Sequence, residues 1–383
     1  MSLSEFGIFS FISSLANLFK SFMSFGGQLY LIYKVSKAKD QKYYYYFKSS
    51  LLSVIIALGI SLCLFFVKLF DQEIINTNHF LFAVLLGSFM VLIQNTYSFF
   101  KGSGAFEKEA KGYFIFLTLI VCSLICFQYN LLVPSLINIL IIVLCIHILL
   151  FIFSTVQLFL YYKKDNSTKE IGKIINDMKG FIKERVPYGF HELQSALYLN
   201  AIIIIMGFLV KEQDLALYRS IQIIIVPISI LPMIFSQVLL KQLTENINNR
   251  VYFNKLFRKF LFFALMTGLL LFTLFYFNGD LIINLFYGER FVEIEYINQL
   301  LLIFASTYLF RFISANYGVL ITAKDKQKIR MYATSALIVV TVTTTILLTK
   351  SLGVLGAAYA NAISYFFIMV VYIIYSEIKL LRN

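Results

Sequence analysis

Long apolar runs separated by short polar and charged breaks dominate the pattern of this 383-residue chain. A helix that crosses a bilayer needs roughly 20 apolar residues. The eleven runs close to that length cover residues 6-33, 49-69, 79-100, 112-128, 132-160, 187-210, 215-240, 259-277, 297-320, 331-349 and 354-377. A membrane barrel would need strands of about 10 residues that alternate in polarity, whereas a run such as LINILIIVLCIHILLFIF is almost uniformly apolar. The pattern predicts an all-α polytopic membrane protein.

The composition fits the same class. Hydrophobic residues make up 60% of the chain and charged residues 14%, and the mean hydropathy is +0.80. A soluble fold of this size would expose more apolar surface than water tolerates. The four cysteines lie inside predicted spans and the three histidines are scattered, so neither type has the spacing of a metal site. No metal or other cofactor is expected.

The net charge of +13 is distributed over alternate breaks between the apolar runs. Basic residues gather in the intervals 34-48, 101-111, 163-185, 241-259 and 324-330 and again at the C-terminus, whereas the intervening breaks are short or acidic. Cytoplasmic loops of membrane proteins carry such an excess of lysine and arginine. The pattern predicts a cytoplasmic C-terminus and, with an odd number of spans, an N-terminus on the other side. The orientation of the spans in the membrane accounts for the positive net charge, so no nucleic-acid partner is expected.

The chain also resembles itself at a shift of 209 residues. This shift places EFGIFSFISSLANLFKSFMSFGGQLYLI on DLALYRSIQIIIVPISILPMIFSQVLLK, and an acid, an aromatic residue and a glutamine near the exit recur. Such repeats are typical of transporters built from two homologous lobes. We therefore predict two pseudo-symmetric helical lobes around a central cavity. The N-terminal lobe would hold five spans in 1-162, and the C-terminal lobe six spans in 187-383.

The first lobe has no counterpart of the run 187-210, which opens the second lobe. A first helix is therefore expected to be absent from the chain as given, through truncation, through a late start codon or because the protein truly has eleven spans. Between the lobes, residues 163-186 contain an apolar stripe opposed by lysines. This stripe predicts a cytoplasmic amphipathic helix on the membrane surface, which serves as a linker or senses lipid.

Three cations fall inside predicted spans, namely Lys20, Arg219 and Arg311. Each costs about 2.5–3.5 kcal/mol at the bilayer centre on insertion scales. Because they stand at different depths on separate helices, they suggest a positively lined cavity between the lobes, suited to an anionic group such as a diphosphate. The alternative is that they snorkel or bind backbone carbonyls freed by Pro227 and Pro232.

Polar positions accompany these cations. Asn17 and Ser24 belong to a polar stripe on the first span, and Gln222 and Ser229 occupy the shifted stripe, so all four are predicted to face the cavity. Glu192 stands near the predicted start of the sixth span, where it is either favoured by the helix dipole or acts in coupling or gating. No P-loop, zincin motif or Ser/His/Asp arrangement occurs, so no catalytic residue is predicted.

Several degenerate stretches, each weak alone, follow one another in a characteristic order: EFGIFSFISSL, VPYGFHELQSALYLNAIIIIMGFL, INLFYGERF, GVLITAKDKQK and SLGVLGAAYANAIS. Together they resemble the Wzx-type flippases of the polysaccharide biosynthesis family, in the multidrug/oligosaccharidyl-lipid/polysaccharide (MOP) exporter superfamily. The chain departs from that pattern by starting at what resembles the second helix. It also carries Asn200 where many relatives have aspartate, which argues against a coupling role at that position.

The resemblance implies a transporter and not an enzyme. Its substrate would be an undecaprenyl-diphosphate-linked oligosaccharide, such as an O-antigen repeat unit of lipopolysaccharide biosynthesis, moved across the bacterial cytoplasmic (inner) membrane by alternating access. Membrane lipid and the glycan polymerase machinery would be further partners. The alternatives are a drug exporter of the same superfamily, disfavoured by the cationic spans, and a membrane glycan polymerase or ligase, disfavoured by external loops of about 20 residues at most.

Overall fold

The computed structural model describes residues 2–37, 41–70, 77–164, 178–294, 296–324 and 326–381. These residues form helices joined by turns and contain no strand, which confirms the predicted all-α class. Ten helical segments in the described chain are long and apolar enough to cross a membrane, one fewer than predicted. The difference arises in α13 (Gln327–Ser376), which includes both of the last two predicted spans. The chain bends there at Gly353, whose φ is +57°.

The chain forms two compact units, Met1–Asn200 (unit 1) and Ala201–Asn383 (unit 2). The division falls inside helix α7 (Met178–Leu209), so the first part of α7 packs with unit 1. The predicted second lobe begins earlier, at residue 187, and the lobe limits stay a prediction. The linker 163-186 is described only at its two ends, because residues 165–177 lie outside the described part of the chain.

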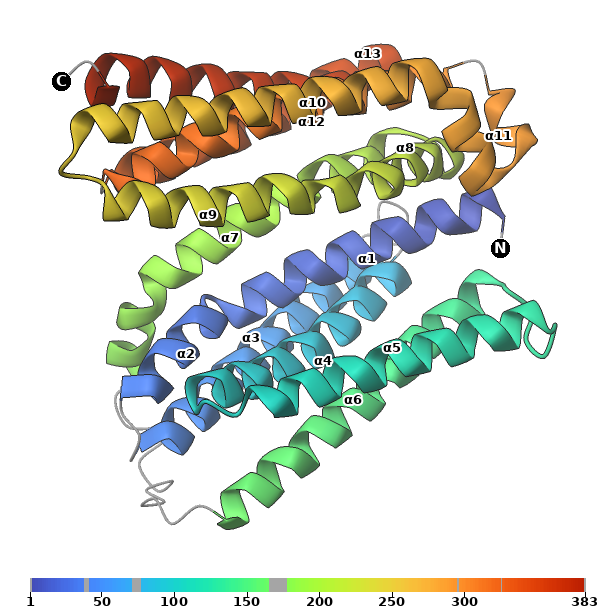
Figure 1. The fold of residues 1–383 in the computed structure, drawn as a ribbon. Coiled ribbons are helices and arrows are strands. Elements are labelled where there is room, and N and C mark those ends of the chain that lie inside the picture. The colour runs from blue at the N-terminus through green and yellow to red at the C-terminus, as the bar shows by residue number, and fades with distance from the viewer. Residues whose placement is uncertain are drawn as a thin grey trace. The chain divides into compact units, whose positions relative to one another are not determined.

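Unit 1 is organised around helix α4, which packs against five other helices of the unit (Figure 1). The helices are α1 (Leu3–Ser24), α2 (Gly27–Lys37), α3 (Lys42–Phe70), α4 (Thr77–Gly102), α5 (Phe106–Gln128), α6 (Leu136–Lys164) and the first part of α7. Gly87 allows α1 and α4 to approach closely, because a Cβ there would lie 2.9 Å from the carbonyl oxygen of Ala16. Half of the apolar stretch of α4 is buried inside the described structure, against 6% of that of α5.

Unit 2 is organised in the same way around helix α12, which packs against α8, α9, α10 and α13 (Figure 1). Its elements are α8 (Glu212–Ile225), the 3-10 helix η2 (Val226–Ser229), α9 (Ile230–Glu245), α10 (Arg250–Tyr287), α11 (Glu289–Val292), α12 (Ile297–Ala323), α13 and a terminal π-helical turn (Glu377–Leu381). The shift of 209 residues carries the first residue of α1 to the first residue of α8. The shift does not relate the ends of these helices, because it carries Ser24 to residue 233 whereas α8 ends at Ile225.

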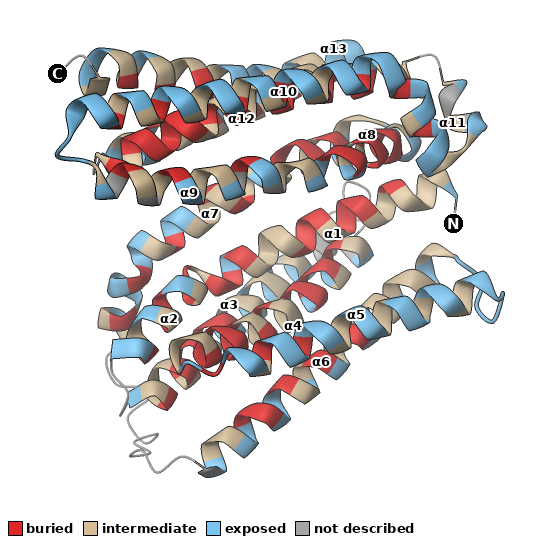
Figure 2. Cartoon of the chain, viewed as in Figure 1, coloured by how far each residue is buried: buried red, intermediate tan, exposed pale blue. Residues whose placement is uncertain are grey.

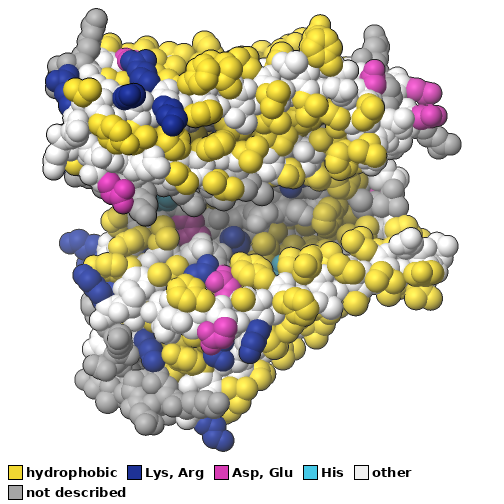
Figure 3. Space-filling view, in the orientation of Figure 1, with side chains coloured by type: hydrophobic (Ala, Val, Ile, Leu, Met, Phe, Trp, Pro, Cys, Tyr) yellow, Lys and Arg dark blue, Asp and Glu magenta, His cyan; other side chains and the backbone are white. Residues whose placement is uncertain are grey.

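The outer surface of both units is strongly apolar. Large hydrophobic side chains remain exposed along the spans, as at Leu58 (65%), Phe114 (71%) and Leu270 (71%). Buried residues are frequent on α12 and rare on α5 (Figure 2). In the space-filling view, lysine and arginine gather near one end of each unit, and hydrophobic side chains cover most of the remainder (Figure 3). Such a surface requires a lipid environment.

Candidate functional site

The first span of unit 1 is interrupted between α1 and α2. Phe25 and Gly26 adopt left-handed backbone conformations there, with φ of +40° and +78°. A Cβ on Gly26 would overlap the backbone of Tyr188 and Gly189, so α7 packs directly against the interruption. Only glycine can adopt this φ while its Cα lies so close to the backbone of another helix. The break therefore belongs to a helix–helix contact and is not a local irregularity.

Arg185 of α7 fills the break. Its guanidinium is fully buried and donates hydrogen bonds to the carbonyl oxygens of Ser24 and Phe25, the latter at 3.2 Å, and to the Ser49 Oγ at 3.1 Å. Interrupting a helix frees carbonyls that find no water in a membrane core. The planar, multi-donor guanidinium satisfies them together. Gly27 leaves space for it, since a Cβ there would lie 2.7 Å from Arg185 Nη2.

Glu192 lies two helical turns farther along α7 and bonds the same break. Its carboxylate accepts from the Gly26 amide at 2.7 Å and from the Ser24 hydroxyl at 3.0 Å. The helix-dipole explanation for Glu192 is wrong, because α7 begins at Met178 and Glu192 is far from the first turn. Pro187, which marked the predicted start of the span, lies inside the helix. Glu192 therefore fixes the break, and its coupling or gating role stays a prediction.

Lys20 completes this group from α1. It lies close enough to Glu192 for the two charges to attract each other. Lys20, Arg185 and Glu192 thus form a cluster of two cations and one anion, with an excess of one positive charge. Ser24, predicted to face the cavity, is fully buried between Glu192 and Arg185. Asn17 is half-buried on α1 and donates to the carbonyl oxygen of Ser13 at 3.0 Å.

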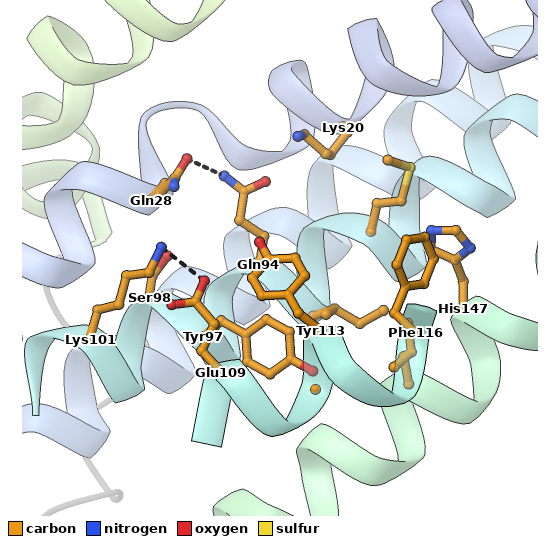
Figure 4. Close-up of a pocket in the computed structure, with 14 residues that line it drawn as sticks. Lys20, Gln28, Gln94, Tyr97, Ser98, Lys101, Glu109, Tyr113, Phe116 and His147 are labelled. Carbon is orange, nitrogen blue, oxygen red and sulfur yellow. Dashed lines mark hydrogen bonds and ion pairs between the residues drawn. The ribbon is translucent and has the colours of Figure 1, made fainter. Parts of the chain in front are cut away.

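A cavity of about 250 Å³ opens in unit 1 among α1, α2, α4, α5 and α6, and Lys20 is part of its wall (Figure 4). An ion pair between Lys101 and Glu109, 2.9 Å long, forms another part of the wall. A hydrogen bond of 2.7 Å joins Gln94 to Gln28 across it. The cavity thus combines one predicted substrate-binding cation with amide, ion-pair and aromatic groups.

The two other predicted cations lie in unit 2. Arg219 of α8 donates to the Gln222 side chain at 2.6 Å, rather than to a described carbonyl near Pro227 or Pro232. Arg311 of α12 lies over two aromatic rings, with its guanidinium carbon 5.4 Å from the Tyr308 centroid and 5.7 Å from that of Tyr365. Ser229 is the last residue of η2, between α8 and α9. A cavity shared by Lys20, Arg219 and Arg311 stays a prediction.

Sequence reasoning missed Arg185, which it counted with the basic residues of the cytoplasmic linker. The missed signal was helical spacing. Arg185 and Glu192 are seven residues apart, which is two turns, so they lie on the same face of one helix. Treating Pro187 as a helix start hid this relation, because it placed the two residues in different elements.

The comparisons with known proteins agree on a family and a fold. The family model for polysaccharide biosynthesis proteins matches residues 1–240. No curated protein matches significantly. Among solved structures, an inward-facing multidrug resistance MATE family transporter of the MOP superfamily is similar with a TM-score of 0.73 and 13% identity, over 98% of this chain and 89% of that chain.

Two further structures show other members of the fold. The lipid II flippase MurJ, in an inward closed conformation, gives a TM-score of 0.61 at 15% identity, over 98% of this chain and 86% of that chain. The second is a MOP superfamily transporter from Pyrococcus furiosus, whose binding pocket of reverse polarity suggests a different function. It gives a TM-score of 0.56 at 12% identity, over 99% of this chain and 86% of that chain. The fold is therefore that of MOP-superfamily transporters.

Proposed function

Since this chain belongs to the polysaccharide biosynthesis family, we propose that it is a flippase for a lipid-linked oligosaccharide. Its substrate would be an undecaprenyl-diphosphate-linked O-antigen or related repeat unit, moved from the cytoplasmic to the periplasmic leaflet of the bacterial inner membrane by alternating access. The glycan polymerase machinery would receive the product. The observation that carries the proposal is Lys20, a cation in the wall of a cavity that also contains amide and ion-pair groups, within a membrane-embedded unit.

The diphosphate sets the main physical demand on such a transporter. Removing an anion from water costs several kcal/mol unless a compensating charge accompanies it. Lys20 offers a flexible ammonium in unit 1, and Arg311 offers a guanidinium oriented by two aromatic rings in unit 2. We infer that these two residues contact the diphosphate in turn, with Arg219 as a third contact. Glu192 would act in gating, because it ties the α1–α2 break to α7, and α7 continues into unit 2.

The decisive experiment replaces Lys20 or Arg311 by alanine and measures the rate at which glycan reaches the cell surface. Each variant should export about tenfold more slowly or worse, the effect of losing a hydrogen bond to a charged group. Lys20→Arg should retain part of the rate because it keeps the charge. Lys328→Ala, at an exposed position, is the matched control. Normal export by both alanine variants at normal abundance would refute the cationic mechanism.

Drug export is the second candidate, because the fold is also that of a multidrug resistance transporter. Cells that produce the protein would then tolerate more of a cationic dye such as ethidium. The flippase proposal instead expects unchanged dye tolerance and accumulation of glycan on the cytoplasmic side when the protein is removed. An enzyme would reveal itself by extending or transferring glycan in a purified preparation, which we do not expect.

The proposed orientation places the C-terminus in the cytoplasm. All four native cysteines are free, so replacing them leaves a background for single reporters. Asn278→Cys lies at the non-helical residue of α10 and Gln327→Cys at the first residue of α13. An impermeant thiol reagent should label the first from outside intact cells and spare the second; the opposite labelling would reverse the orientation.

A further inference from the structure

We propose that the unit 1 cavity is a subsite for one sugar ring of the transported glycan. The proposal rests on the proposed function, since it supposes that a glycan enters this protein. It assigns a ligand class to a cavity of about 250 Å³ inside a single unit. That volume suits a monosaccharide better than a whole oligosaccharide or a lipid chain.

The chemistry of the wall fits a sugar. A sugar ring has apolar C–H faces and a rim of hydroxyls that both donate and accept hydrogen bonds. The cavity supplies aromatic rings from Tyr97, Tyr113 and Phe116 for the faces. Two glutamines and the Lys101–Glu109 pair supply both donors and acceptors for the rim. A lipid tail could not bond the donors and acceptors that these groups have left after pairing with one another, at a cost in free energy.

One wall group already lacks a partner. The Tyr97 side chain is only 6% exposed, and its hydroxyl has no hydrogen-bond partner among the described residues. Leaving a buried hydroxyl unsatisfied is unfavourable, and such groups are rare in native proteins. The hydroxyl lies against Gly112, where any Cβ would overlap it. Because this oxygen is closed to solvent where it packs on Gly112, the Tyr97 side chain must turn away from Gly112 before a sugar hydroxyl can supply the missing partner.

The wall is also held in place before any ligand arrives. Gln94 is bonded to Gln28, and Glu109, with a side chain 11% exposed, is bonded to Lys101. His147 bonds the carbonyl oxygen of Val143 through Nδ1 at 2.8 Å, and its ring meets Phe116 edge to face at 5.9 Å. Side chains fixed in this way lose little freedom when a ligand binds. The cavity is therefore organised as a binding site.

The position of Lys20 indicates which sugar would occupy the site. Lys20 belongs to the same wall as the aromatic rings (Figure 4). A diphosphate held at Lys20 would bring the sugar attached to it to the mouth of this cavity, whereas distal sugars would lie outside. The subsite would thus select the sugar next to the diphosphate.

The chain contains no tryptophan, which allows a direct binding test on the full-length protein. Tyr113 is 59% exposed at the cavity, so Tyr113→Trp places a single fluorescent reporter in its wall. The purified variant is titrated with free monosaccharides: neutral hexoses, N-acetylhexosamines and hexuronic acids. At least one class should change the emission in a saturable way. The same titration of Phe66→Trp, an exposed site on α3, should give no saturable change.

A second pair of variants tests the hydroxyl. Adding Tyr97→Phe to the reporter should weaken sugar binding roughly fivefold, the effect of one lost neutral hydrogen bond. The Tyr46 hydroxyl lies outside the cavity wall and pairs with the Thr96 hydroxyl at 3.1 Å. Adding Tyr46→Phe to the reporter should therefore leave sugar binding unchanged. Tyr97→Phe should also slow glycan export in cells more than Tyr46→Phe does.

The outcomes separate the two proposals. Saturable sugar binding that depends on Tyr97, in a protein that exports no glycan, would support the subsite and refute the flippase. Normal glycan export together with a reporter that responds to no sugar, and with an unaffected Tyr97→Phe rate, would refute the subsite and leave the flippase standing. An equal loss of binding in Tyr97→Phe and Tyr46→Phe would also refute the subsite, because the effect would then come from general destabilisation.

Discussion

Each unit interrupts its first repeated span, but by different chemistry and at positions that the shift of 209 residues does not relate. In unit 1, the break between α1 and α2 uses a glycine at φ +78° and is held by Arg185 and Glu192 from α7. In unit 2, the break between α8 and α9 is the 3-10 helix η2, which contains Pro227. Proline breaks a helix through its own ring, whereas the unit 1 break needs a second helix. The unit 2 break is a local feature of the sequence, whereas the unit 1 break is a feature of the tertiary structure.

One kind of side-chain group occurs in both units, at positions that the shift of 209 residues does not relate. A glutamate near the end of each unit binds one tyrosine and one cation. In unit 1, Glu184 accepts from Tyr30 at 2.9 Å and pairs with Lys34 at 2.6 Å. In unit 2, Glu377 accepts from Tyr317 at 2.7 Å and pairs with Arg258 at 2.7 Å. Each unit thus holds one tyrosine–glutamate–cation group, whereas the bent helix is held differently in the two units.

The largest expected effect tests the glycine of the unit 1 break. Gly26→Ala should lower the free energy of unfolding by about 4 kcal/mol or more, because a side chain there meets the backbone of α7 and adopts an unfavourable φ. Heating the detergent-solubilised protein and measuring the fraction that stays monodisperse gives the change in stability.

Gly59→Ala is the matched control for that substitution. Gly59 lies within α3, and a Cβ there meets nothing within 4 Å. Alanine should raise stability by about 0.5–1 kcal/mol through its better helix propensity. If Gly26→Ala were as well tolerated as Gly59→Ala, the close contact between the break and α7 would be wrong.

The second prediction compares the arginines of the two units. Arg185→Ala should lower the free energy of unfolding by about 3–5 kcal/mol, because it leaves the freed carbonyls without their buried donor and removes one of the two cations near Glu192. Arg219→Ala should lower the free energy of unfolding by about 1.5–3 kcal/mol at most, since that side chain is half-buried and donates a hydrogen bond to Gln222. Unfolding midpoints and membrane abundance measure both. Equal losses would mean that the two breaks are held in the same way.

The smallest effect concerns the paired glutamates. Glu184→Gln and Glu377→Gln should each reduce stability by about 1 kcal/mol or less, because their ion pairs are partly exposed and screened by salt. The two losses should be similar and should shrink further in high salt. A clearly larger loss in one unit would show that the two tyrosine–glutamate–cation groups are not equivalent.

The fold was largely predictable because lipid imposes simple requirements on sequence. Ten helical segments of the described chain fall where apolar runs predicted them, since each run must satisfy its own backbone in the membrane. The break predicted between residues 349 and 354 coincides with the bend of α13 at Gly353. One boundary was less visible, because α7 begins at Met178 although Pro187 resembles a start signal. Local composition marks spans well but does not always mark where a helix begins.

The candidate site was predictable only in part. Lys20 stands out because a cation in an apolar run is costly, and it does line the unit 1 cavity. Gln94 and Tyr97 gave no such signal, because polar and aromatic residues are common in membrane helices and their meeting depends on how α4 packs against α1, α2 and α5. Arg185 was missed because its partners are backbone carbonyls, which no residue pattern reveals.

The bond between α7 and the α1–α2 break has a consequence for biogenesis. A membrane protein is synthesised from its N-terminus, so α1 to α6 leave the ribosome before Arg185 and Glu192 do. Until α7 arrives, the carbonyls of Ser24 and Phe25 and the amide of Gly26 lack the partners they have in the folded unit. Unit 1 therefore cannot complete its core one helix at a time. Its folding waits for a helix whose remaining residues belong to the other unit.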